Sequence, residues 1–209
     1  MKQLVNWYIK YLRKTDEDSD NEFRSIFSSS VTIEEKAKLL LIGDHQWYLI
    51  PFHKDELQSM LSMLCARKPW EQNILATSFE ELFQECKTQL NYNCIKQLTI
   101  YDVALRMAIL FNRKDLFPSQ YIYLHATPMI AYRWLYKHHL VNVKVSGSLA
   151  SIDICNLNGV FGSLNAREIE NLLCHLEKAI KRLKENKQHL SKDKREIELD
   201  SIVNKLKMK

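Results

Sequence analysis

The sequence predicts an α+β protein that is mainly helical, with a small three-stranded sheet and a long C-terminal helix. Only 4 glycines and 4 prolines occur among 209 residues, too few for a turn-rich all-β protein. Apolar residues recur at helical spacing in several segments, and most of these begin with a capping residue. Residues 121–125 and 140–155 instead show the alternation or aromatic content of strands.

The N-terminal segment is predicted to form an amphipathic helix. Leu4, Val5, Tyr8 and Leu12 recur at near-helical spacing, and lysines occupy the opposite face. Because the segment is short, a helix docked on the domain is favoured over one that lies on a membrane surface. The acidic, polar residues 15–21 are predicted to form a linker.

Four further features lie between residues 32 and 81. Residues 32–35 and 78–81 each place Glu three positions after Thr or Ser, the pattern of a capping box at a helix start. Residues 55–67 carry apolar side chains on one helical face. The aromatic-rich residues 46–52 are predicted to be extended.

The central region is predicted to contain two helices separated by a strand. Thr99, with Asp102 three residues later, is expected to cap an apolar helix that ends before the turn residues 112–118. Residues 121–124 form the predicted strand. Thr127-Pro128 is a strong start signal for the second helix. His125 is therefore expected between a strand and a helix start, where backbone N–H groups can bind an anion.

The last third is predicted to change from strands to helices. Valines at 141, 143 and 145 alternate with polar residues, residues 146–148 form a turn, and residues 149–154 follow, so a β-hairpin is predicted. Asn165 and Glu168 form a capping box that opens a long helix, and a second amphipathic stretch follows it. The predicted domains are 1–164, globular with a small sheet, and 165–209, basic, amphipathic and helical.

Composition predicts a soluble, cytoplasmic protein. The N-terminus has no continuous apolar core or cleavage site, and no window is apolar for long enough to span a membrane. The five cysteines show no CxxC spacing, so reduced and mostly buried thiols are expected. Common nucleotide-binding and catalytic patterns such as GxGxxG, GxSxG and HExxH do not occur. No cofactor and no metal site are predicted.

One candidate polar site is predicted, around His125. His125 and Asp102 are the candidate catalytic residues, since an imidazole titrates near neutral pH and can act as general acid or base. Arg106, Tyr123 and Arg133 are the candidate ligand-binding residues, and their arginines suit phosphate or carboxylate. The alternative is structural: Asp102 and Arg106 form a surface i,i+4 ion pair, and His125 makes a local hydrogen bond.

The C-terminal region holds most of the charge imbalance. Residues 167–209 contain 12 Lys or Arg and 8 Asp or Glu, which gives +4 of the net +5. A basic run could contact nucleic-acid phosphates. Its candidate residues are Lys178, Lys181, Arg182, Lys184 and Lys187. Interleaved aromatics for base stacking are missing, so a solvated face or partner helix is the favoured interpretation.

Three hypotheses for function follow. The leading one is a non-enzymatic, intracellular interaction or regulatory protein that binds a protein partner or itself through amphipathic helices. The second is a nucleic-acid-binding protein that uses the basic C-terminal helix. The third is a small phosphate-ester or nucleotide enzyme centred on His125.

Overall fold

A computed structural model describes most of the chain. It covers residues 1–30, 32, 35–36, 39–40, 76–89, 97–147, 150–157, 159–187 and 193–207. The extended segment predicted at 46–52 and the helix predicted at 55–67 lie outside these residues.

The chain divides into two compact units. Unit 1 consists of Met1–Asp16 and Pro118–Lys209, and unit 2 consists of Glu17–Phe117. The two ends of the chain therefore fold together in unit 1. The boundary predicted between residues 164 and 165 falls inside unit 1.

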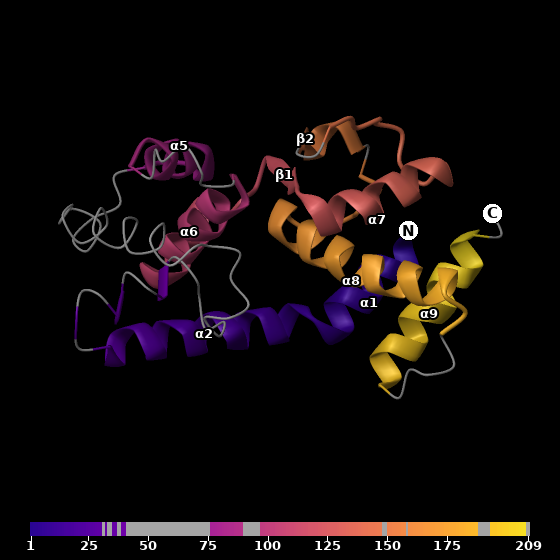
Figure 1. The fold of residues 1–209 in the computed structure, drawn as a ribbon, viewed down its shortest axis with the longest axis horizontal. Helices are drawn as coiled ribbons and strands as arrows, with labels where there is room; N and C mark the ends of the chain where they lie inside the picture. The colour runs from indigo at the N-terminus through magenta and orange to yellow at the C-terminus, as the bar shows by residue number, and fades with distance from the viewer. Residues whose placement is uncertain are drawn as a thin grey trace. The chain divides into compact units, whose positions relative to one another are not determined.

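The protein is mainly helical, as predicted (Figure 1). Two strands, β1 (Tyr121–Leu124) and β2 (Ala150–Asp153), and two short 3-10 helices, Lys114–Leu116 and Ile154–Leu157, complete the elements. Seven α-helices have defined bounds among the described residues: α1 (Lys2–Tyr11), α2 (Arg13–Ser29), α5 (Phe79–Gln89), α6 (Gln97–Leu110), α7 (Ala126–Lys137), α8 (Ala166–Lys184) and α9 (Lys194–Lys207). None of the helices in the described residues is long and apolar enough to cross a membrane.

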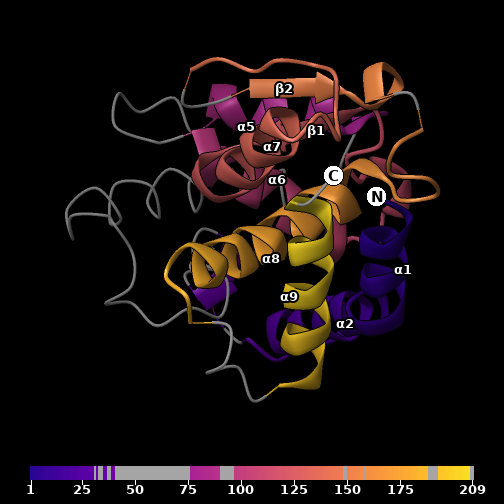
Figure 2. The ribbon, with the colours of Figure 1, turned by 90° about the vertical axis from the view of Figure 1, so that its right-hand side faces the viewer.

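Unit 1 is built around α8, which lies between α7 and α9 (Figures 1 and 2). The α8 side chains of Ile169, Leu172, Leu173 and Leu176 are completely inaccessible to solvent. Burying a side chain of this size contributes about 1.5–3 kcal/mol through the hydrophobic effect. The C-terminal region thus forms two packed helices, α8 and α9, where the sequence predicted a long helix followed by a second amphipathic stretch.

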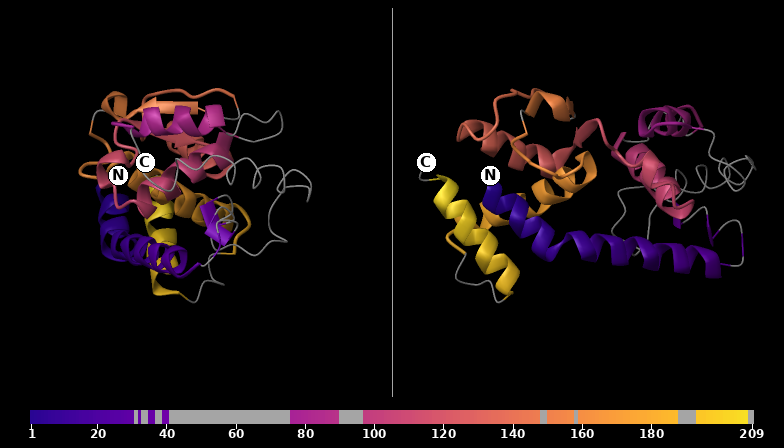
Figure 3. Two further views of the ribbon diagram at one scale, coloured as in Figure 1. Left: turned by 90° about the vertical axis from the view of Figure 1, so that its left-hand side faces the viewer. Right: turned by 180° about the vertical axis from the view of Figure 1, so that it is seen from behind.

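The N-terminal helix α1 docks on unit 1, as predicted. Leu4 and Tyr8 are almost fully buried, and α1 packs against α9, as Figure 3 also shows. The indole Nε1–H of Trp7 donates a hydrogen bond of 2.9 Å to the carbonyl of Arg195. Lys10 pairs with Glu198 at 2.8 Å. The apolar face of α1 is therefore used within the fold.

Unit 2 has its own core between α5 and α6. Phe79 of α5 lies edge-on to Tyr101 of α6, with ring centroids 5.4 Å apart. The thiol of Cys86 lies 3.6 Å from the sulfur of Met107. Burial raises the pKa of the Cys86 thiol to about 12, so it stays protonated at neutral pH.

The prediction of a third strand is wrong. The sheet has two strands, in which β1 pairs antiparallel with β2, Tyr121 opposite Asp153 and Leu124 opposite Ala150. Residues 141–147 have no strand structure. Their carbonyl groups bind side chains of α7 instead: the Tyr132 hydroxyl donates to Val143 over 3.1 Å, and Arg133 donates to Gly147.

Three predicted boundaries are also wrong. Residues 15–21 belong to α2 and are not a linker; Asp16, in the first turn, carries a charge that suits the positive end of the helix dipole. Helix α6 begins before Thr99, which lies inside it. Helix α7 starts at Ala126 with His125 as its N-cap, so the Thr127-Pro128 signal misplaces the start by two residues.

Two of the three predicted capping boxes are confirmed in full, and the third in part. Asn165 and Glu168 form the complete reciprocal box at the start of α8. Thr32 and Glu35 do the same, with both bonds at 3.1 Å. At α5, Ser78 accepts from the Glu81 N–H, but the Glu81 carboxylate binds Thr77 instead of completing the box.

The cysteines only partly follow the prediction of burial. Cys86, Cys155 and Cys174 are free thiols, and only Cys86 is buried. Cys155 is exposed because it lies in the turn after β2, where its backbone N–H donates to Asp153. Cys65 and Cys94 are outside the described residues.

Replacing Tyr132 by Phe tests the anchoring of residues 141–147. We expect the free energy of unfolding, measured by urea titration, to fall by about 1 kcal/mol, because the Val143 carbonyl loses its hydroxyl donor. Tyr136→Phe is the control, since Tyr136 lies on the same helix but is 36% exposed. Equal stability of the two variants would contradict the proposed anchoring.

Candidate functional site

The five residues predicted to form one polar site are divided between the two units. Asp102 and Arg106 lie on α6 in unit 2, whereas Tyr123, His125 and Arg133 lie in unit 1. Of these five residues, Asp102 and Arg106 contact each other.

In unit 2, Asp102 and Arg106 form the i,i+4 pair expected from the sequence. Their charged groups are 3.8 Å apart. The Arg106 guanidinium also donates to the carbonyl of Leu40 over 2.9 Å. Arg106 therefore stabilises the local packing of unit 2 through both contacts.

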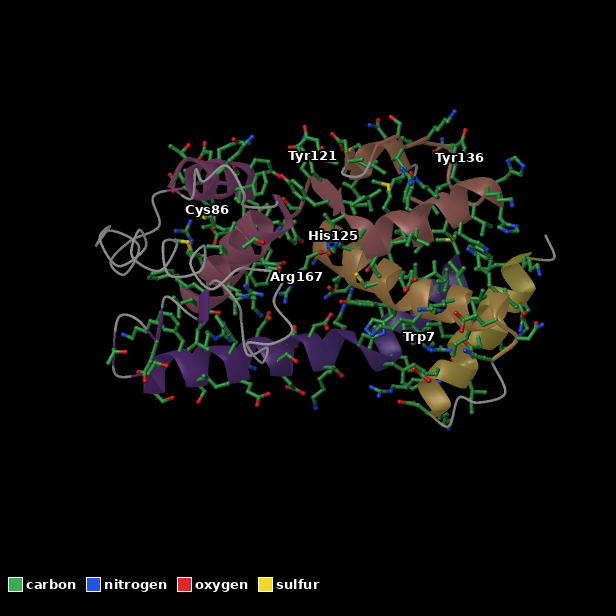
Figure 4. All side chains as sticks on the ribbon, in the orientation of Figure 1. Trp7, Cys86, Tyr121, His125, Tyr136 and Arg167 are labelled. Carbon is green, nitrogen blue, oxygen red and sulfur yellow. The ribbon has the colours of Figure 1, made fainter. Side chains whose placement is uncertain are left out.

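In unit 1, His125 contacts a carboxylate that the sequence analysis did not single out (Figure 4). His125 Nε2 lies 2.7 Å from Glu170 Oε1 on α8, and the two side chains are 17% and 8% exposed. This contact is short enough for a hydrogen bond between the imidazole and the carboxyl group. The pair joins the β1–α7 junction to α8.

A second polar cluster joins the chain's N-terminal segment to the first turns of α8. Asp16 accepts from the Tyr8 hydroxyl and, over 3.0 Å, from the Asn171 amide. Arg13 binds both carboxylate oxygens of Glu168, at 2.5 and 3.0 Å. Burial, together with the Asp16 carboxylate, raises the pKa of Tyr8 well above its usual value. These contacts join the start of α2, and through Asp16 also Tyr8 of α1, to α8.

The other two predicted residues have structural contacts. Tyr123 lies in β1 opposite Ser151 and is half-buried. Arg133 is exposed on α7 and donates to the Gly147 carbonyl. Arg133 also lines a pocket in unit 1.

This pocket, called the basic pocket below, lies where the C-terminal ends of three helices meet. Its volume is about 470 Å³, within the range typical of ligand-binding pockets. It is lined by Ile130, Arg133, Trp134, Lys137, His138, Leu183, Lys184 and Lys207. Four of these residues carry a positive charge at neutral pH, a fifth is His138, and none is acidic.

The charges around the basic pocket are not neutralised by nearby acids. Lys137, Lys184 and Lys207 are exposed, and no ion pair is found for them among the described residues. Burial, and then the charges of Lys137 and Lys207, lower the pKa of His138. Lysines at helix C-termini are favourable for the helix dipole, which accounts for part of their clustering. The helix dipoles do not cancel the positive charge of these side chains, so the electrostatic potential outside the pocket stays positive.

The basic residues predicted on α8 do not form one continuous surface. Arg182 is held by Asp200 at 2.8 Å and by Glu196 at 3.2 Å, which fixes α9 against α8. Lys187 pairs with Glu185 at 3.0 Å. Lys184 lines the basic pocket, and Lys181 is exposed.

Lys178 lines a second, smaller cavity of about 100 Å³ between α1, α8 and α9. His175 lies in the wall of this cavity, with its ring centroid 5.9 Å from that of Trp7. Arg195 and Asp193 also line it and pair with each other at 2.6 Å. Arg182, Arg195 and Asp193 in the wall of this cavity already have partners.

Comparisons with known proteins add no functional assignment. No family model matches the sequence, and neither the curated proteins nor the solved structures contain a match. Within the described residues, no group of three or more His, Cys, Asp or Glu is placed to hold a metal ion. The fold defines the class of protein as mainly helical with a small two-stranded antiparallel sheet.

A double-mutant cycle tests the His125–Glu170 contact. We expect His125→Gln and Glu170→Gln each to lower the free energy of unfolding by about 1–3 kcal/mol, since each replaces a charge-assisted, buried hydrogen bond. The double variant should lose less than the sum of the two, with a coupling of about 1 kcal/mol or more. Strict additivity in urea unfolding would show that the contact contributes no stability.

The buried imidazole of His175 predicts a loss of stability in mild acid. Burial, followed by the charge of Lys178 and, more weakly, that of Arg195, lowers the pKa of His175, while Asp16 and Glu196 act in the opposite direction. Between the folded-state pKa and about 6.5, the unfolded chain binds more protons, so unfolding becomes easier as the pH falls.

This effect can be assigned to His175 by comparison with a variant. Urea unfolding at pH 7.5 and 5.5 should show a smaller pH dependence in His175→Gln than in the unchanged protein. An NMR titration of His175 measures its pKa directly, and a value above 6.5 would contradict the expected shift.

Proposed function

We propose that this protein is a non-enzymatic interaction protein and that it binds a protein partner through the basic pocket of unit 1. The proposal is supported by one observation above the others: four positively charged residues surround exposed apolar surface, and no acidic residue lines the pocket. Protein interfaces commonly combine an apolar centre with a charged rim.

The sequence placed the binding surface on the apolar faces of the amphipathic helices, but most of these faces are buried. The apolar faces of α1, α8 and α9 are buried in the core of unit 1. Large exposed apolar side chains are few among the described residues, and two of them, Ile130 and Tyr136, lie on α7. We therefore place the proposed contact on the exposed face of α7 and the neighbouring helix ends, where Ile130 is 46% exposed within the basic pocket.

Nucleic-acid binding is the second candidate, because the same lysines could contact phosphate groups. Such binding would weaken steeply with salt, in proportion to the number of phosphates neutralised. Arg182 supports it less than the sequence suggested, since its guanidinium is fixed by Asp200 and Glu196. The enzyme hypothesis rests on His125 alone, because Asp102 belongs to unit 2 and the nearest group to His125 is Glu170.

Site-specific photo-crosslinking tests the proposed function. A photoreactive phenylalanine analogue replaces Ile130 in one variant and Ile197 in the control, which is 52% exposed but lies outside the basic pocket. In cells that produce the protein, we expect a discrete protein adduct from position 130 and none of the same size from position 197. Lys137→Gln combined with Lys184→Gln should reduce this adduct severalfold.

Two outcomes would count against the proposal. One is an adduct pattern that is the same at both positions, which would indicate nonspecific contact. The other is an adduct at position 130 that disappears on nuclease treatment, which would favour nucleic acid.

A further inference from the structure

We infer that the partner presents a short acidic peptide segment with one large apolar side chain, which enters the basic pocket. This inference rests on the proposed function and adds the chemical identity of the partner's binding segment. It follows from three properties of the pocket: its charge, its apolar surface and its size.

The first property is the charge. Lys137, Lys184 and Lys207 come from the ends of three different helices, and no ion pair is found for them among the described residues. Arg133 adds a fourth positive charge. Its hydrogen bond with Gly147 is to a neutral carbonyl group and does not neutralise that charge. The field of these groups attracts an anionic partner and repels a cationic one. Carboxylates spaced along a peptide can reach lysines on separate helices.

The second property is the apolar surface within the ring of charges. The side chain of Ile130 is 46% exposed, and Leu183 is half-buried. Covering such surface contributes about 25 cal/mol for each Å² removed from water. A purely ionic ligand would leave this surface uncovered, whereas a Leu, Ile or Phe side chain would bury it.

The kind of side chain exposed in the pocket favours a peptide over a nucleic-acid base. The bases of single-stranded nucleic acids commonly bind proteins by stacking on aromatic side chains. The only aromatic ring besides His138 among the described lining residues is that of Trp134, which is 9% exposed and already packs on His138 with centroids 4.4 Å apart. The accessible apolar groups are instead aliphatic, which suits an aliphatic or phenyl side chain.

The third property is the size. A volume of about 470 Å³ exceeds that of any single amino-acid side chain, so one large side chain and its neighbouring residues can enter together. Recognition of this type resembles peptide binding in which one apolar anchor sets the position and charges on either side add specificity.

Fluorescence anisotropy with synthetic peptides tests this inference on the full chain. The probe is a labelled nine-residue peptide with six Asp or Glu around a central Leu. Two matched peptides carry either Ser in place of Leu or Asn and Gln in place of the acids. We expect the acidic Leu peptide to bind at least tenfold more tightly than both, because each matched peptide lacks one of the two required features.

Protein variants assign the binding to the pocket. Lys137→Glu combined with Lys184→Glu should weaken binding of the acidic Leu peptide at least tenfold. Lys2→Glu combined with Lys14→Glu makes the same change in net charge outside the pocket, near the starts of α1 and α2, and should weaken binding less than threefold. Since acidic residues at helix C-termini can destabilise the fold, Lys137→Gln with Lys184→Gln is measured as well, and circular dichroism checks all variants.

Other outcomes would overturn the inference. Equal binding of the Leu and Ser peptides would mean simple charge attraction, and no binding of either would exclude acidic peptides. Tighter, pocket-dependent binding of a single-stranded oligonucleotide, or of vesicles containing phosphatidylserine, would assign the pocket to nucleic acid or to a membrane surface.

If the peptides fail while a protein adduct still forms at position 130, this inference is wrong and the proposed function stands. If both fail, both are wrong.

Discussion

The burial of α8 is the constraint on which unit 1 depends. Its apolar side chains, such as Leu172 and Leu176, are completely enclosed by α7, α9 and β1. A helix enclosed on several sides must place every polar side chain next to a partner or at an exposed end, because an unpaired polar group in the interior costs several kcal/mol. The polar contacts of unit 1 follow from this requirement. Glu170 meets His125, Asn171 meets Asp16, and Arg182 meets Asp200.

The same constraint divides α8 into two halves with different properties. In the N-terminal half, acidic and amide groups bind partners from the start of α7 and from α2, so these groups act within the fold. In the C-terminal half, Arg182 is used to hold α9, and Lys184 remains at the surface with Lys137 and Lys207. The charges available to a partner are therefore those that form no ion pair within the described part of the packed helices. Their position follows from the favourable interaction of cations with helix C-termini.

Local signals in the sequence predicted local structure well, and contacts distant in sequence account for the errors. The Asn165–Glu168 box involves neighbouring residues only, so its residue types sufficed to predict it. The alternation at 141–145 is real, but Tyr132 binds the carbonyl of Val143 and Arg133 binds that of Gly147 just beyond, and no local pattern indicates these contacts. Glu170 was missed as a partner of His125, although a signal existed. It occupies a core position of the α8 pattern, four residues after Ala166 and three before Leu173, both of which are buried.

The surface that suits a binding function combines one face of α7 with the C-terminal ends of α7, α8 and α9. Sequence periodicity identifies amphipathic faces, but it does not tell whether a face is covered by the same chain or by another. In unit 1 most apolar side chains of α1, α8 and α9 lie in one core, although Ile9 and Ile197 stay exposed on α1 and α9. The ends of the helices are less subject to this burial, since their last carbonyl groups require solvent, caps or positive charge. Surface that the core does not cover remains available to a partner. Ile130, exposed on α7 among three lysines without ion pairs in the described structure, is such a surface.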